Sequence, residues 1–192
     1  MSKTAPPSQR ALRSAGLLAR RSMSAIERAH ASRRITDRLF RAHEFTSADS
    51  IACFLPMEDE VDMHPVFARA WRAKKRIFAP VIDTHDEMKF TVLQPETTIV
   101  RNRFGLWEPE SDFEIEPEKL DVVVTPVVAF DNSCNRIGMG GGHFDRTFAF
   151  LGSKRNWIRP KLIGLAFDCQ KVEKISPKPW DIRLYQVFSH SG

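Results

Sequence analysis

Long hydrophobic runs are missing from this sequence of 192 residues, and cysteine is scarce. No apolar stretch approaches the ~20 residues needed to span a bilayer. The opening Met-Ser-Lys-Thr-Ala-Pro-Pro has no apolar signal core, so we expect neither a membrane partner nor secretion. The three cysteines, Cys53, Cys134 and Cys169, are odd in number, and no pair has the spacing of zinc ligands. We therefore expect reduced thiols in a cytoplasmic protein.

Internal repeats, low-complexity tracts and a second domain boundary are also lacking. A chain of this length, with 42% hydrophobic residues, can bury one sizeable core. We expect a single domain over residues 1–192. Residues 1–8 contain Pro6-Pro7 among small polar neighbours, and we expect them to be disordered.

Positive charge is in excess, with a formal net charge of +5 that is concentrated near the start of the chain. A basic cluster of this kind can bind nucleic acid, attract a small anionic substrate, or form a solvated helix face. The solvated face is the better explanation for most of these arginines, and few aromatic residues lie near the basic run for base stacking on nucleic acid. A nucleic-acid-binding module stays an alternative. The residues are Arg10, Arg13, Arg20, Arg21, Arg28, Arg33, Arg34, Arg38 and Arg41.

Apolar periodicity predicts strands that alternate with helices. Ser24 to Glu27 is a capping-box pattern, and the following stripe of Ala31, Ile35, Leu39 and Ala42 is typical of a core-facing helix. We expect an α/β fold with a mostly parallel central sheet and helices on both faces, in a Rossmann-like three-layer arrangement. The predicted helices are Gln9–Arg21, one from Ser24, Pro65–Ala73 and Phe144–Leu151; the predicted strands are Ser50–Leu55, Arg76–Ile82, Met88–Leu93, Leu120–Thr125, Lys161–Phe167 and Val187–Phe188, with Thr97–Glu116 irregular.

The stretch from Asn135 to Arg146 is the most informative, since four of the nine glycines lie within five of its residues. Glycines let backbone N–H groups approach an anion, and a helix N-terminus adds partial positive charge. Arg136 and Arg146 bracket the loop and can clamp phosphate oxygens, while Asp145 beside it can hold Mg²⁺. The dinucleotide and P-loop motifs fit poorly, because His143 replaces the third glycine and no lysine follows. A plain glycine turn without a ligand stays open.

Several motifs, taken in order, resemble the 5-formyltetrahydrofolate cyclo-ligase family, also called 5,10-methenyltetrahydrofolate synthetases. Arg-Ile-Gly-Met-Gly-Gly-Gly-His-Phe-Asp-Arg, residues 136–146, is similar to the family's Arg-Leu-Gly-x-Gly-x-Gly-Tyr-Tyr-Asp signature. The resemblance covers about the whole chain. The other matching segments are Phe54–Asp62, Lys75–Pro80, Phe104–Pro109, Leu120–Asp131 and Asp168–Gln170.

The resemblance implies an enzyme that uses ATP to convert 5-formyltetrahydrofolate into 5,10-methenyltetrahydrofolate, with release of ADP and phosphate. The formyl oxygen would be phosphorylated first, and the folate N10 would then displace phosphate from the activated carbon. It also implies Mg²⁺ as cofactor, small-molecule partners without nucleic acid, and a fold like that of sugar-phosphate isomerases and CoA transferases. A relative of the sugar-phosphate isomerases or CoA transferases is another alternative, because fold does not fix function. We expect a monomer.

For ATP, the resemblance implies that the glycine loop holds the phosphates while Arg136 and Arg146 act as catalytic residues. Asp145 would hold Mg²⁺, although an acid there also favours the helix dipole. Arg10 and Arg13 lie in a pattern like the family's Lys-x-x-Leu-Arg, with Gln9 at the lysine position. The implied ATP set is Arg10, Arg13, Arg136, Gly138, Met139, Gly140, Gly141, Gly142, His143, Phe144, Asp145 and Arg146.

For the folate, the resemblance implies that Glu60 accepts N–H groups of the pterin ring. The walls that stack on its flat rings would be apolar and aromatic. Two departures matter: His143 and Phe144 replace the family's two tyrosines, keeping a ring but losing the hydroxyl, and Tyr185 stands where many members carry a second metal-binding Asp. The implied substrate-binding set is Phe54, Leu55, Met57, Glu60, Trp107, His143 and Phe144.

Overall fold

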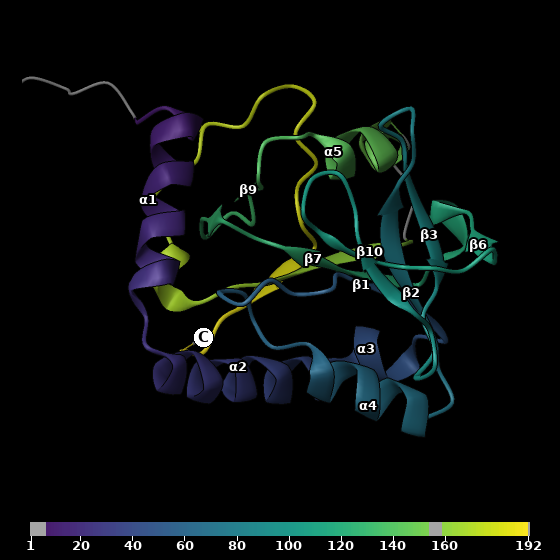
Figure 1. Cartoon of the computed structure of the whole chain (residues 1–192). Coiled ribbons are helices and arrows are strands. Elements are labelled where there is room, and N and C mark those ends of the chain that lie inside the picture. The colour runs from purple at the N-terminus through teal and green to yellow at the C-terminus, as the bar shows by residue number, and fades with distance from the viewer. Residues whose placement is uncertain (1–6, 154–158, 192) are drawn as a thin grey trace, which may run out of the picture.

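The structure, a computed structural model, describes residues 7–153 and 159–191 (Figure 1). The expected disorder of residues 1–8 falls mostly outside the described residues. Ser8 is described, and its hydroxyl caps the first helix by accepting a hydrogen bond from the backbone N–H of Ala11. The helices are α1 (Gln9–Ser22), α2 (Ala25–Leu39), α3 (His43–Ser47), α4 (His64–Arg72), α5 (His143–Thr147) and α6 (Ala149–Ser153), with short 3-10 turns η1 (Pro117–Lys119) and η2 (Asp168–Gln170). The strands are β1 (Ser50–Cys53), β2 (Arg76–Ile82), β3 (Met88–Val92), β4 (Ile99–Arg101), β5 (Trp107–Pro109), β6 (Glu114–Ile115), β7 (Val122–Pro126), β8 (Ala129–Phe130), β9 (Arg136–Ile137), β10 (Lys161–Leu165) and β11 (Gln186–Phe188).

Seven of the described strands form the central sheet, in the order β11-β10-β7-β1-β2-β3-β6. The first five in this order run parallel, and β3 and β6 join antiparallel. The predicted, mostly parallel sheet is therefore confirmed. The chain builds to one side of β1 through β2 and to the other side through β7. The carboxyl ends of β1 and β7 thus form a topological switch point, where ligands bind in open α/β sheets.

Helices cover both faces of the sheet, as predicted. In Figure 1, α2, α3 and α4 lie below the sheet, α5 lies above it, and α1 stands at one end beside β9. Alternation along β1 explains the two layers, because Ile51 and Cys53 belong to one buried cluster and Ala52 to the other. Ile35 and Leu39 of α2 are fully buried in the first cluster, as their spacing predicted.

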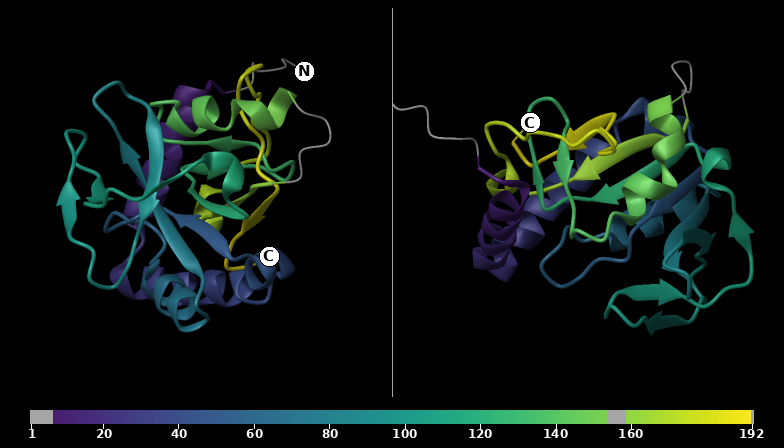
Figure 2. Two further views of the ribbon diagram at one scale, coloured as in Figure 1. Left: turned by 90° about the vertical axis from the view of Figure 1, so that its right-hand side faces the viewer. Right: turned by 90° about the horizontal axis from the view of Figure 1, so that it is seen from above.

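The segment between β3 and β7 differs from the prediction. Thr97–Glu116 was expected to be irregular, but it contains β4, β5 and β6. The first two pair as a separate antiparallel hairpin, which stands away from the main sheet in Figure 2. These strands have two or three residues each, too few for apolar alternation to show in a sequence.

The predicted helix Phe144–Leu151 is also wrong as a single element, since it is divided into α5 and α6. The break is at Phe148, whose φ of −101° and ψ of 16° depart from helical values. The Phe148 ring is fully buried against Phe90, Phe144 and Phe150. Tertiary packing of this ring thus overrides the local helical pattern.

Candidate active site

A cavity of about 230 Å³ lies at the carboxyl ends of the central strands. Phe54 follows β1, Pro126 ends β7 and Ile82 ends β2, and all three line the cavity. This is the switch point defined by the strand order. Most of the predicted site residues line the same cavity: Arg13, Phe54, Leu55, Glu60, Trp107, Arg136, Gly138, Met139, Gly140, Gly141, Gly142, His143, Phe144 and Asp145.

Three predicted residues do not line the cavity. Arg10 is exposed on the first turn of α1, and the neighbouring Gln9 lines the cavity instead. Met57 contributes through its backbone N–H, which donates to Glu60 Oε2 at 3.0 Å. Arg146 is exposed and donates from Nη1 to the carbonyl oxygen of Gly141 at 2.8 Å, so it braces the glycine loop from outside the cavity.

The glycine loop, residues 138–142, has two positions with a positive φ, where glycine is favoured. Gly140 and Gly142 have φ values of 108° and 70°. Arg13 Nε donates to the carbonyl oxygen of Gly138 at 2.8 Å, and a Cβ on Gly140 would lie 3.4 Å from the Arg13 guanidinium carbon. Helix α1 therefore packs directly onto the loop and contributes a positive charge to it.

Arg136 and Asp145 form an ion pair at the base of the loop. Arg136 Nη2 lies 3.0 Å from Asp145 Oδ1, and Arg136 is only 8% exposed. Burial lowers the pKa of Arg136, and the charges of Asp145 and Asp181 oppose this. The buried Nε of Arg136 has no hydrogen-bond partner among the described residues. A buried N–H without an acceptor costs about 1–3 kcal/mol, so Arg136 keeps hydrogen-bonding capacity that its protein neighbours do not use.

Carboxylates gather at this end of the cavity but do not form a complete metal site. Asp145 Oδ1 also accepts from the backbone N–H of Ile182 at 3.0 Å, and Asp181 lines the cavity beside it. The described residues include no group of three or more His, Cys, Asp or Glu side chains placed to hold a metal ion. Tyr185 lies elsewhere, because its hydroxyl donates to Glu44 in α3 at 2.8 Å. Tyr185, the residue that stands in place of a second metal-binding Asp, therefore lies outside the cavity.

Glu60 lies at the opposite wall, on the loop after β1. Its Oε1 accepts from Arg20 Nη1 at 3.0 Å, and its Oε2 accepts from the Met57 backbone N–H. Burial raises the pKa of Glu60, and the charge of Arg20 opposes this. Each carboxylate oxygen has a second lone pair, so Glu60 can still accept from a ligand.

The apolar wall is formed by Phe54, Leu55 and Trp107. Phe54 is 5% exposed, whereas Trp107 is 37% exposed and carries the Arg101 guanidinium 4.4 Å from its ring centroid. Trp107 belongs to β5 rather than to an irregular segment. Its exposed face makes it the better candidate for stacking on a flat ligand.

His143 and Phe144 have different roles in the structure. His143 Nδ1 lies 3.2 Å from the Asp86 carbonyl oxygen and 3.1 Å from Arg146 Nη2. It therefore connects the glycine loop to the β2–β3 turn. Phe144 stacks on Phe148 at 6.2 Å and belongs mainly to the core beneath the loop.

Several cavity residues were not predicted. Glu108 follows Trp107 in a motif that matched the family, and it is buried with Oε1 accepting from the Ile82 backbone N–H at 2.8 Å. The Lys178–Asp181 segment combines a lysine, a tryptophan and an acid, but it lies in a stretch without periodic pattern. Gln9 donates from Nε2 to Asp181 Oδ2 at 2.7 Å and joins the two ends of the chain there. The unpredicted lining residues are Gln9, Pro80, Ile82, Met88, Leu106, Glu108, Pro126, Val128, Ile137, Lys178, Trp180 and Asp181.

Among residues 7–153 and 159–191, no helix is long and apolar enough to cross a membrane. A mostly parallel sheet with a cavity at its switch point, lined by a glycine loop and a buried arginine, defines an α/β protein that binds small molecules. Residues 5–190 match the sequence model of the 5-formyltetrahydrofolate cyclo-ligase family, so the chain belongs to this family of ligases.

Named relatives support this assignment. The chain is 34% identical over 178 residues to the 5-formyltetrahydrofolate cyclo-ligase of Escherichia coli K12, covering 90% of this chain and 94% of that protein. It is 31% identical over 174 residues to the Haemophilus influenzae protein of the same name, covering 88% of this chain and 90% of that protein. The solved structure of Aquifex aeolicus 5,10-methenyltetrahydrofolate synthetase superposes with a TM-score of 0.81 at 25% identity, covering 96% of this chain and 90% of that one. A Mycoplasma pneumoniae structure of the same name, 24% identical, has a TM-score of 0.75 and supports the fold, covering 95% of this chain and 99% of that one.

Proposed function

We propose that this protein catalyses the ATP-dependent cyclisation of 5-formyltetrahydrofolate to 5,10-methenyltetrahydrofolate, with release of ADP and phosphate. The observation that supports this most is that one cavity brings the glycine loop and the loop carrying Glu60 together. These are the two segments that resemble the family's nucleotide and folate motifs. No observation specifically favours the nucleic-acid-binding or isomerase alternatives.

The two walls of the cavity suit the two substrates. On one wall, the loop N–H groups, Arg13 and Arg136 supply positive charge for phosphates. On the other, Glu60 supplies an acceptor for pterin N–H groups and Trp107 a face for stacking. The cavity volume is below the ~300–1,000 Å³ of most small-molecule sites. We propose that it takes the reacting ends of the substrates, with their remainders along the open surface.

The proposed reaction has two steps. The formyl oxygen attacks the γ-phosphorus of ATP, and the bond to ADP breaks. N10 then attacks the activated formyl carbon, the carbon–oxygen bond breaks, and the phosphate leaves together with the N10 proton. Arg136 stabilises the charge on the transferred phosphoryl group, and Arg13 holds the loop against it. The protein thus contributes mainly positioning and electrostatic stabilisation.

Mg²⁺ fits this site when it is held partly by the nucleotide. Asp145 Oδ2 and Asp181 Oδ1 have no hydrogen-bond partner among the described residues, while the second oxygen of each is engaged. Mg²⁺ commonly binds through one or two carboxylates plus phosphate oxygens and waters. We propose that Asp145, with Asp181 beside it, holds the ion, which would neutralise phosphate charge.

We further propose a cytoplasmic, monomeric enzyme of one domain that acts on small molecules rather than nucleic acid. Its three cysteines are unpaired, as a reducing compartment favours. Size-exclusion chromatography with light scattering tests the oligomeric state: a mass near 22.0 kDa is expected, and twice that mass would contradict the monomer.

The proposed function is tested by following near-ultraviolet absorbance, because methenyltetrahydrofolate absorbs there far more than the substrate. Purified protein with 5-formyltetrahydrofolate, ATP and Mg²⁺ should give a steady rise in absorbance. Omitting ATP, or adding excess chelator, should abolish the rise. No product with all components present would overturn the proposed function, and an undiminished rise in excess chelator would overturn the metal requirement.

A further inference from the structure

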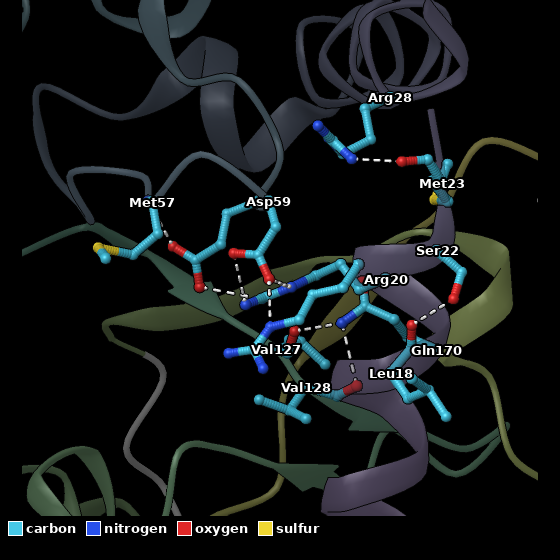
Figure 3. Close-up of polar contacts among 12 residues, drawn as sticks. Leu18, Arg20, Ser22, Met23, Arg28, Met57, Asp59, Val127, Val128 and Gln170 are labelled. Carbon is cyan, nitrogen blue, oxygen red and sulfur yellow. Dashed lines mark hydrogen bonds and ion pairs between the residues drawn. The ribbon is translucent and has the colours of Figure 1, made fainter. Parts of the chain in front are cut away.

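Arg20 is a buried charge that no part of the proposed reaction uses. It lies near the end of α1 and is only 3% exposed. Its guanidinium makes three hydrogen bonds to two carboxylates: Nε and Nη2 to Asp59 at 3.2 and 3.0 Å, and Nη1 to Glu60 at 3.0 Å. Figure 3 shows Arg20 reaching from α1 to Asp59. A buried arginine is retained only where its charge is matched, and here both matching acids come from the loop after β1.

Helix α1 contacts both halves of the cavity. Arg13 bonds to the glycine loop, and Arg20, two helical turns later on the same face, bonds to the loop that carries Glu60. Gly16 lies between them, and a Cβ there would lie 2.3 Å from the Val128 carbonyl oxygen. The helix therefore approaches the segment between β7 and β8 closely at its middle and places one arginine toward each half.

Arg20 lies beside a hydrogen-bonded part of the core. Gln170 of η2 donates from Nε2 to the carbonyl oxygens of Val127 and Val128 at 2.6 and 3.0 Å, as Figure 3 also shows. Arg20 and Gln170 line the same small pocket as Glu60. A guanidinium held in this way fixes the carboxylate that it binds, because a planar fork constrains direction as well as distance.

We propose that Arg20 is a positioning residue for folate: its fork holds Asp59 and Glu60 so that Glu60 presents an ionised, fixed carboxylate to the pterin ring. This rests on the proposed function. It adds a residue that contacts no substrate yet determines how well the folate binds. It also assigns α1 a role in both half-sites, with Arg13 acting on the nucleotide and Arg20 on the folate.

The charges around Glu60 predict the direction in which its protonation should change when Arg20 is removed. The charges near Glu60 are Arg20 from α1, Asp59 from its own loop and Arg21, whose Nε lies 3.4 Å from Asp59 Oδ2; Cys169 of η2 lies beside Arg20. The other charged or titratable residues that line the cavity are Arg13, Arg136, Lys178, His143, Glu108, Asp145 and Asp181. Burial already raises the pKa of Glu60, and the Arg20 charge opposes that rise. Removing Arg20 leaves burial and Asp59 acting together, so Glu60 takes up a proton at a higher pH than before.

The experiment compares Arg20→Gln and Arg20→Lys with Arg21→Gln. Arg21 is a matched control, because it is the next residue on α1 and also touches Asp59, but its side chain is 66% exposed and has no bond to Glu60. KM for 5-formyltetrahydrofolate, KM for ATP and kcat are measured by product absorbance between about pH 6 and pH 8.5. Circular dichroism confirms that each variant is folded.

For Arg20→Gln we expect the folate KM to rise about tenfold or more near pH 6 and to fall as pH increases, since Glu60 regains its charge. The ATP KM should stay unchanged, and in wild type and Arg21→Gln any rise of the folate KM on acidification should begin at a lower pH than in Arg20→Gln. Arg20→Lys keeps the charge without the fork, so its folate KM should be raised but should follow the pH dependence of wild type.

Two results would overturn the inference while leaving the proposed function intact. One is an active Arg20→Gln enzyme with an unchanged folate KM; the other is a raised KM with the pH dependence of wild type, which is what loss of packing alone would give. If Arg20→Gln does not fold, Arg20→Lys decides, and a wild-type folate KM in that variant counts against the proposal. A wild-type protein that forms no product at all overturns the proposed function and this inference together.

Discussion

Arg13 Nε donates a hydrogen bond of 2.8 Å to the carbonyl oxygen of Gly138, and this contact joins the first helix to a loop 125 residues later. The same guanidinium lies where a Cβ on Gly140 would begin to touch it. The bond directs the loop carbonyl of Gly138 toward α1, and the arginine adds its charge to the wall where the phosphates are proposed to bind. Arg10, one turn earlier on the same helix, is exposed and makes no such contact.

Replacing Arg13 should therefore weaken ATP binding, whereas replacing Arg10 should not. A hydrogen bond that involves a charged group contributes about 1.5–3 kcal/mol. For Arg13→Ala this corresponds to a rise of roughly 10- to 100-fold in the KM for ATP. Arg10→Ala removes the same charge from the same helix and serves as the control. Steady-state kinetics with ATP varied at saturating folate measure both. Equal effects of the two variants would mean that only general positive charge matters.

Glu60→Gln should raise the KM for 5-formyltetrahydrofolate and leave the KM for ATP nearly unchanged. The loss of a charged acceptor weakens pairing with the pterin by about 1.5–3 kcal/mol. Glu58→Gln, at an exposed position two residues earlier, is the matched control. Trp107→Ala should act in the same direction by removing a stacking surface. Titration of each substrate against each variant measures this, and a change confined to ATP would show that the folate loop is wrongly assigned.

Gly141→Val should have the opposite selectivity and affect ATP far more than folate. A Cβ at Gly141 would lie 2.8 Å from the His143 ring, which is itself held at the Asp86 carbonyl oxygen. The loop must shift to accept the side chain, and its N–H groups then lose their alignment. Isothermal titration with a non-hydrolysable ATP analogue and with 5-formyltetrahydrofolate measures both affinities. Weaker folate binding with intact nucleotide binding would contradict the division of the cavity.

Gly16→Ala should destabilise the protein although alanine is the better helix former. The gain in helix propensity is about 1 kcal/mol, but the new Cβ would lie 2.3 Å from a backbone oxygen of Val128 and must push α1 away from the segment between β7 and β8. Overpacking of this kind costs about 1–3 kcal/mol. The control is Gly152→Ala in α6, where the nearest atom is a side-chain methyl of Ile182 at 3.4 Å. Urea unfolding should show a lower free energy of unfolding for Gly16→Ala and no loss for Gly152→Ala. Equal gains in the two variants would contradict the packing argument.

Asp131→Asn should lower stability near neutral pH, and the difference from wild type should shrink as the solution is acidified. Burial raises the pKa of Asp131, but donors from Asn135, Ile175 and Ser133 outweigh it and hold the pKa below its ordinary value. A carboxyl with a depressed folded-state pKa stabilises the fold above its unfolded pKa, near 4, and loses that contribution as pH falls through the folded pKa. Unfolding free energies at a series of pH values measure this. A difference that grows on acidification would contradict the assignment.

The layers and central strands could be predicted because they depend on local patterns. The continuous apolar run of β1 and the apolar stripe of α2 are properties of consecutive residues, and both are buried in the structure. The β4–β5 hairpin could not be predicted, since strands of three residues carry no measurable period. The division at Phe148 was missed because it depends on rings that lie far away in the sequence, such as Phe90.

The candidate site could be predicted where its residues are close together in the sequence. The glycine loop with Arg136 and Asp145 is such a case, and these residues do line one cavity. Arg146 has the right residue type, but the loop turns its guanidinium onto the Gly141 carbonyl outside the cavity. Asp181 was missed because the C-terminal segment has no periodic pattern; it is held at the site by contacts with residues far away in the sequence, from Gln9 to Asp181 and from Ile182 to Asp145.

The most direct test of the proposed chemistry is to follow the formyl oxygen. 5-Formyltetrahydrofolate labelled with ¹⁸O in its formyl group is converted with unlabelled ATP, and the released phosphate is analysed by mass spectrometry. Because the formyl oxygen attacks phosphorus and its bond to carbon then breaks, each phosphate should carry one labelled oxygen for every methenyl product formed. Unlabelled phosphate, with the label found in water, would contradict phosphoryl transfer to the formyl group and with it the role proposed for the glycine loop and Arg136.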